Sequence, residues 1–208
     1  MITVFGAPPS RSQRVIWMLE EMGLPYEVRR VDFANRQEDA EFMAASPAGA
    51  MPGMVDGNVR MMESVAILEY LGAKYGPTPL VPAPDDSSWP AYLTFLHFGE
   101  ASLMAPLNVT IGSRFFAPDE EKDNWGSRHA VDILVRKSAA LADQLKRHPY
   151  AAGDAFTAAD ISCAFPLGVA AFLGVADRLD PILTDYLARM RERPAYQAAA
   201  AHAGPGPS

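Results

Sequence analysis

The stretch that decides the fold covers residues 50–71 and reads AMPGMVDGNVRMMESVAILEYL. Two short β-prone runs, Gly53–Asp56 and Val59–Met62, flank an Asp-Gly-Asn sequence, which is typical of a hairpin turn. Apolar residues then recur at helical spacing, which predicts a helix over Ser64–Tyr75. The stretch therefore predicts a β-hairpin followed by a helix.

Two dipeptides at the ends of this hairpin are candidate binding groups. Met51-Pro52 stands where the first strand begins, and a cis bond there turns the Met51 backbone outward, where it can pair with another peptide as an added strand. Ser64 opens a helix, whose free N–H groups favour an anion. Glu63 beside it can accept from an ammonium group, so the pair can recognise an amino-acid zwitterion. The alternative is that Ser64 only caps the helix and Glu63 is a solvated charge.

Upstream of the hairpin, the chain predicts a strand, a helix and a second strand. Ile2–Phe5 is β-prone, and a proline-rich loop follows it. Ser10 or Ser12 can cap a helix that Gly23 closes, and residues 25–32 alternate like a strand. A helix is also expected near residues 40–43. The order predicts a βαβ unit with parallel pairing, followed by a ββα unit.

Downstream, residues 76–88 contain four prolines and no periodicity, which predicts a domain boundary. We expect a first domain over residues 1–76, a linker over 77–88 and an all-helical domain over 89–208. The tail from residue 195 is expected to fray after a final helical turn. The expected helices of the second domain cover residues 89–108, with Pro106 near its end, 119–147, 157–173 and 180–192.

Composition narrows the classes of function. The chain has 208 residues, 49% of them hydrophobic, and a net charge of −7, which argues against nucleic acid as the main partner. No apolar run reaches the length of a membrane span, and the start lacks the pattern of a secretion signal. Cys163 is the only cysteine, which excludes an internal disulfide and fits a reducing cytoplasm. The four histidines show no metal-ligand spacing, so we expect no metal site.

Two hydroxyl-bearing residues near helix starts differ in what they predict. Ser10 follows a strand and precedes a helix, where a hydroxyl donor and a positive helix end both lower the pKa of a thiol brought there. The alternative is that Ser10 is only a helix cap. Thr157 and Asp160, in the sequence Phe-Thr-Ala-Ala-Asp-Ile, have the spacing of a capping box, which is a folding signal. Cys163 in the same helix is expected to be buried and inert.

Three motifs in this order resemble the cytosolic glutathione S-transferase family, and the resemblance covers almost the whole chain. Met51-Pro52 stands where the family has Val-cis-Pro. Residues 63–71 (ESVAILEYL) are similar to its "ESxAIxxYL" helix, and residues 152–161 (AGDAFTAADI) to its "GDxFTxADI" capping box. The resemblance implies a thioredoxin-like α/β domain followed by an all-α helical domain.

The resemblance also implies a function and a set of site residues. Glutathione is expected as co-substrate, without a metal, in a cytoplasmic homodimer that conjugates the thiolate to a small hydrophobic electrophile in detoxification. Ser10 matches the activating serine of theta- and zeta-like members, although the loop can also be aligned with Ser12 closest to the sulfur. We expect Ser10 to be the closer of the two, because Ser12 lies one helical turn further from the strand. The residues expected to bind glutathione are Gln37, Met51, Pro52, Glu63 and Ser64, and those expected to line the acceptor site are Pro8, Phe98, Met104, Ile111 and Phe115.

Two further readings of the resemblance remain open. A glutathione-dependent isomerase or ether-cleaving lyase would use the same residues on one specific substrate. A non-catalytic binding protein of the same fold is the third possibility. Ala50 mildly favours it, because the family often has Lys or Arg there, whereas Met51-Pro52 and Glu63-Ser64 argue against it.

Overall fold

The structure is a computed structural model that describes residues 1–6, 9–122 and 124–202. The chain forms two compact units. The first combines Met1–Thr78 with Arg191–Ser208, and the second is Pro79–Met190. The boundary near Thr78 lies within the proline-rich stretch. The thioredoxin-like α/β order of the first unit and the helices of the second confirm the predicted fold class.

A four-stranded sheet forms the centre of the first unit, in the order β2-β1-β3-β4. Strand β1 (Ile2–Phe5) pairs parallel with β2 (Tyr26–Arg29) and antiparallel with β3 (Gly53–Asp56), which forms a hairpin with β4 (Val59–Met62). The predicted hairpin is confirmed. The predicted strand at 25–32 is too long, because the four residues of β1 offer partners only from Tyr26 to Arg29.

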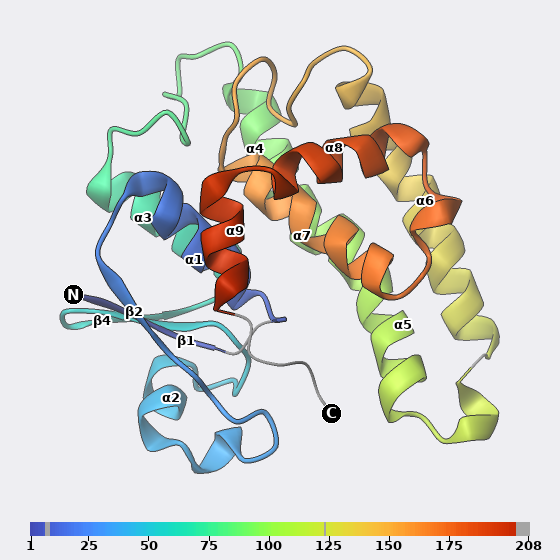
Figure 1. The fold of residues 1–208 in the computed structure, drawn as a ribbon, viewed down its shortest axis with the longest axis horizontal. Coiled ribbons are helices and arrows are strands. Elements are labelled where there is room, and N and C mark those ends of the chain that lie inside the picture. The colour runs from blue at the N-terminus through green and yellow to red at the C-terminus, as the bar shows by residue number, and fades with distance from the viewer. Residues whose placement is uncertain (7–8, 123, 203–208) are drawn as a thin grey trace. The chain divides into compact units, whose positions relative to one another are not determined.

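Helices cover both faces of this sheet. Helices α1 (Ser12–Met22) and α3 (Ser64–Tyr75) lie on one face, and α2 (Ala40–Ala45) lies on the other (Figure 1). Helix α1 ends at Gly23, whose φ of 63° is the left-handed conformation that closes a helix. The side chains buried between the sheet and its helices include Val4, Ile16, Leu19, Met54, Ile67 and Leu68.

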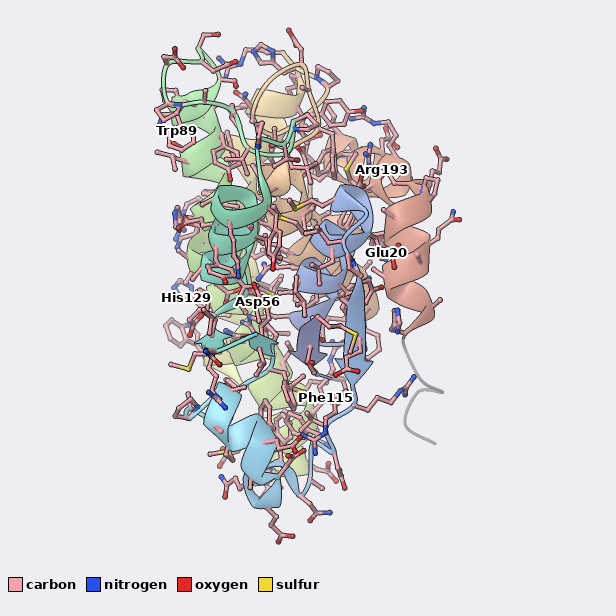
Figure 2. The ribbon with its side chains drawn as sticks, turned by 90° about the vertical axis from the view of Figure 1, so that its left-hand side faces the viewer. Glu20, Asp56, Trp89, Phe115, His129 and Arg193 are labelled. Carbon is pink, nitrogen blue, oxygen red and sulfur yellow. The ribbon has the colours of Figure 1, made fainter. Side chains whose placement is uncertain are left out.

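A buried carboxylate joins the hairpin to α3. Asp56 Oδ2 accepts hydrogen bonds from Lys74 Nζ at 2.6 Å, Tyr75 Oη at 2.7 Å and Tyr70 Oη at 2.9 Å. Burial raises the pKa of Asp56, but these hydrogen bonds outweigh it and hold the pKa below its usual value. Asp56 lies beside α3 in Figure 2. The cluster fixes α3 against the sheet and so helps to position the start of that helix.

The last helix, α9 (Pro194–Ala201), belongs to the first unit and packs against α1. Tyr196 meets Trp17 edge to face, with ring centroids 5.0 Å apart. Arg193, which Figure 2 shows beside α1, donates two hydrogen bonds to the carboxylate of Glu21 at 2.6 and 2.8 Å. The sequence predicts a single helical turn before the tail frays, but α9 has 8 residues and extends to Ala201, because tertiary contacts stabilise this alanine-rich segment.

The second unit is helical. Apart from an isolated bridge between Tyr150 and Gly153, its described residues form no β-structure. Helix α4 packs on α7, and α5 packs on α6. No helix in the described part of the chain is both long and apolar enough to cross a membrane. The elements are α4 (Trp89–Phe98), a π-helix (Gly99–Met104), α5 (Ala105–Phe116), α6 (Trp125–Leu145), α7 (Ala158–Phe172) and α8 (Pro181–Arg191), with short 3-10 helices at Asp119–Glu121 and Ala176–Arg178.

The first helical segment of this unit does not stop near Pro106, so the predicted end at residue 108 is wrong. A π-helix, Gly99–Met104, joins α4 to α5, and Pro106 lies in the first turn of α5, where a missing N–H is tolerated. Gly99 allows the π-helix to approach α7 closely, because a Cβ at this position would lie 2.4 Å from the carbonyl oxygen of Ser162. The segment therefore continues to Phe116. The start predicted at residue 119 is also wrong, since α6 begins at Trp125 after the Asn124 cap.

The predicted capping box is confirmed at the start of α7. The N–H of Thr157 donates to Asp160 Oδ2 at 2.8 Å, and its hydroxyl donates to the same atom at 3.2 Å. Asp160 Oδ1 also accepts from the N–H of Ala151 at 2.8 Å and from Tyr186 Oη at 2.7 Å. Complete burial raises the pKa of Asp160, and these four hydrogen bonds partly oppose that effect. Cys163 is buried, as expected, and its thiol donates to the carbonyl oxygen of Phe95.

Candidate functional site

The peptide bond between Met51 and Pro52 is cis. Pairing in the sheet starts at Gly53, so Met51 lies just outside the ladder of β-strand hydrogen bonds. The loop before it is held by its own hydrogen bonds, since Ser46 Oγ donates to the carbonyl oxygen of Ala50 at 2.6 Å and the N–H of Gly49 donates to Ser46. The loop therefore holds the Met51 backbone just before the first residue of β3.

Gln37 lies in the 3-10 helix Arg36–Glu38, and its side chain is exposed. The neighbouring Arg36 donates through Nε to the carbonyl oxygen of Gly49 at 2.9 Å. This bond connects the segment of Gln37 to the loop that precedes Met51. Both therefore belong to one surface of the first unit.

Ser64 is the first residue of α3, as the sequence predicted, and Glu63 occupies the N-cap position before it. The buried hydroxyl of Ser64 accepts a hydrogen bond from Arg14 Nη1 at 3.2 Å. Arg14 lies in α1 and is itself fully buried. A buried guanidinium and the N-terminus of α3 thus bring positive charge to the same point, which favours a bound anion. The sequence analysis missed Arg14, and its only signal is a charged residue directly before the apolar run of α1.

Glu63 has an unusual backbone, with φ of 71° and ψ of 104°. It is the only non-glycine residue of the described chain with a positive φ, and such a conformation costs about 1–3 kcal/mol. The exposed side chain makes no hydrogen bond that caps α3, while its carbonyl oxygen accepts from the N–H of Ile67 at 3.0 Å. Strain that stabilises nothing locally is typical of a functional position.

Ser10 and Ser12 lie next to each other, with their hydroxyl oxygens 2.7 Å apart. The expectation that Ser12 lies one helical turn further from the strand than Ser10 is wrong, because a Cβ at Gly6, directly after β1, would lie 2.5 Å from Ser12 Oγ and 3.7 Å from Ser10 Oγ. The N–H of Ser12 donates to Ser10 Oγ at 3.3 Å. Ser10 is partly exposed, whereas Ser12 is completely buried. Of the two residues, only Ser10 is accessible to solvent.

The residues expected to line the acceptor site differ in their exposure. Pro8 lies outside the described residues. In the helical unit, Phe98 and Ile111 are partly buried and Met104 is buried. Phe115, labelled in Figure 2, is 51% exposed and stacks on Phe172, which is 70% exposed, with ring centroids 6.0 Å apart. The sequence analysis missed Phe172, which had no signal beyond its place at the end of an apolar helix.

A search of the described residues finds no group of three or more His, Cys, Asp or Glu side chains that could hold a metal ion. The candidate site of the first unit instead consists of hydroxyls, a carboxylate, a buried guanidinium and backbone groups. Such groups bind a polar organic ligand through hydrogen bonds and charge.

The chain is similar to known proteins of one family. The family model described as "Glutathione S-transferase, N-terminal domain" matches residues 1–73. Glutathione S-transferase 3 of Schizosaccharomyces pombe is 33% identical over 177 residues, covering 80% of this chain and 73% of that protein. A probable maleylacetoacetate isomerase of Vibrio cholerae is 28% identical, with 92% of this chain and 91% of that protein covered.

A solved structure extends the likeness to three dimensions. The glutathione transferase of Pseudomonas putida, with one glutathione disulfide bound per subunit, superposes with a TM-score of 0.85 at 26% identity. The match covers 99% of this chain and 92% of that one. The motifs, the fold and these matches agree, and the chain therefore belongs to the glutathione S-transferase family of enzymes.

Proposed function

We propose that this enzyme binds glutathione in its first unit and joins it, through its sulfur atom, to a small apolar electrophile. The observation that carries this proposal is the start of α3. There Ser64, the buried Arg14 and the helix N-terminus favour a carboxylate, and Glu63 offers a carboxylate of its own to an ammonium group. An α-carboxylate and an α-ammonium on one carbon are the chemistry of the γ-glutamyl end of glutathione.

The other contacts follow from the placement of the loop before β3. The N–H and C=O of Met51, just outside the ladder, pair with the cysteinyl backbone of glutathione as an added strand would, and Pro52 links Met51 to the first residue of β3. The side chain of Gln37 reaches the glycyl carboxylate. These roles assign each glutathione residue to a separate segment of the first unit.

In the reaction, Ser10 donates a hydrogen bond to the thiolate and lowers the pKa of the bound thiol. The thiol proton leaves to solvent, and the sulfur attacks an electrophilic carbon. A C–S bond forms as the bond to the leaving group breaks, and the leaving group departs with the electron pair. In the helical unit, the apolar acceptor meets Phe115 and Phe172 together with Phe98 and Ile111, and the enzyme serves detoxification.

The likeness to the Vibrio cholerae protein supports a second candidate, an isomerase that uses glutathione and regenerates it. The two are distinguished by the fate of glutathione, which conjugation consumes and isomerisation returns. Binding of glutathione without turnover of any electrophile would instead favour a non-catalytic binding protein.

Glutathione affinity, measured by calorimetry, tests the proposed site through two substitutions at one position. Glu63→Gln keeps the backbone and removes the charge, and we expect about 10-fold weaker binding from the loss of one charge-assisted hydrogen bond. Glu63→Gly removes the carboxylate and also relaxes the positive φ, so it should bind as weakly while raising the free energy of unfolding by about 1 kcal/mol. Absence of binding to the wild-type protein at millimolar glutathione would refute the proposal.

We further propose that two copies form a homodimer and that the enzyme works in the cytoplasm. The family resemblance supports the dimer, and the absence of paired cysteines fits a reducing compartment. Light scattering on the protein as it elutes from a size-exclusion column measures the mass of the assembly directly. A mass of 22.5 kDa, that of one chain, would contradict the dimer.

A further inference from the structure

The contact between Ser10 and Ser12 has a direction that follows from burial. A hydroxyl offers one proton and two lone pairs. Within the described chain, Ser10 Oγ is the only hydrogen-bond partner of the completely buried Ser12 Oγ. If Ser10 donated to Ser12, the buried Ser12 proton would have no acceptor there, and a buried donor without an acceptor destabilises the folded state. Ser12 therefore donates and Ser10 accepts.

Ser10 Oγ then accepts twice, from the hydroxyl of Ser12 at 2.7 Å and from the N–H of Ser12 at 3.3 Å. Both of its lone pairs are occupied, so its own proton points away from Ser12. Because Ser10 is the partly exposed member of the pair, that direction leads to the surface. Accepting two hydrogen bonds also polarises a hydroxyl and makes it a stronger donor.

We infer that Ser12 is a positioning residue that orients the Ser10 proton toward the glutathione sulfur. The inference rests on the proposed function, and it divides two roles between the serines: Ser10 touches the sulfur and Ser12 does not. Gly6 makes the arrangement possible, because a Cβ at this position would lie 2.5 Å from both Cβ and Oγ of Ser12. The end of β1 thus leaves room for a serine that faces inward.

Two substitutions separate the hydrogen bond from the filling of space. Ser12→Ala removes the donor, and Ser12→Cys fills the site with a much weaker donor. In both variants we expect the pKa of the bound glutathione thiol, followed by thiolate absorbance against pH, to rise by about half a unit to one unit, the equivalent of one hydrogen bond. A Ser12→Cys variant with the wild-type pKa would overturn the inference, as would Ser12→Ala with an unchanged pKa. Gly6→Ala, which displaces Ser12, should resemble Ser12→Ala.

A second measurement uses the protein without glutathione and does not depend on the proposed function. Deuterium isotope shifts on the serine Cβ resonances, in equal parts of H2O and D2O, report how long each hydroxyl proton stays bound. We expect a slowly exchanging proton on Ser12 and a rapidly exchanging one on Ser10. A slowly exchanging proton on Ser10 would overturn the assigned direction. A protein that shows the expected exchange but binds no glutathione would refute the proposed function alone.

Discussion

Replacing Ser10 with alanine is expected to lower kcat/KM for the conjugation of an aryl halide about 100-fold at pH 7, because it raises the pKa of the bound thiol by about two units. Ser10 is the partly exposed member of the serine pair and stands before the N-terminus of α1. One hydrogen bond to a charged sulfur and the positive helix end together supply about 3 kcal/mol in favour of the thiolate. Loss of the hydroxyl removes the larger part of that preference.

The pH dependence identifies the cause. The thiolate is the reactive form, so the rate rises with pH through the pKa of the bound thiol and then levels off. In Ser10→Ala this pKa is higher, so the rise occurs at higher pH and the deficit shrinks above both pKa values. A deficit that is equal at every pH would show that Ser10 does not act on the thiol pKa. Ser87→Ala, at an exposed serine of the second unit, is the matched control and should retain the wild-type profile.

Substitution of Asp160 by alanine is expected to have the largest effect on stability, lowering the free energy of unfolding by at least about 3 kcal/mol. Four donors converge on this buried carboxylate, from Ala151, Thr157 and Tyr186. Alanine leaves all four without their acceptor in the core of the second unit. Urea unfolding followed by circular dichroism measures the difference.

Two further variants provide a smaller change in the same hydrogen-bond network and a control outside it. Tyr186→Phe removes a single donor and should cost about 1 kcal/mol, which remains measurable if Asp160→Ala does not fold. Asp154→Ala, in the loop before α7, changes an exposed carboxylate and should stay within about 0.5 kcal/mol of the wild type. An Asp160→Ala protein as stable as Asp154→Ala would mean that the network contributes little.

The sequence predicts the elements whose ends are encoded locally. Strands β1, β3 and β4 and helix α3 match their expected bounds, because a glycine, a tight turn or a proline marks at least one end of each. Elements that depend on distant contacts are predicted less well. The π-helix between α4 and α5 needs the close approach of Gly99 to Ser162, and α9 needs the face of α1, so neither has a local pattern.

The same division holds for the candidate site. Glu63, Ser64 and Met51 can be proposed from the sequence, because they stand at a helix start and before a strand, and a sequence displays both. Arg14 and the contact between Ser10 and Ser12 depend on which side chains are buried and which atoms meet, and only coordinates supply that. The positive φ of Glu63 is likewise invisible in a sequence, since no glycine marks it.

The docking of α9 on α1 affects the order in which the two units can finish folding during synthesis. Tyr196 and Arg193 lie more than 170 positions from the residues of α1 that they contact. During synthesis, the sheet and its three helices emerge long before α9 does, so one side of α1, including Trp17, waits for the last part of the chain. The whole helical unit is translated in that interval. The first unit to emerge from the ribosome is therefore the last to be completed.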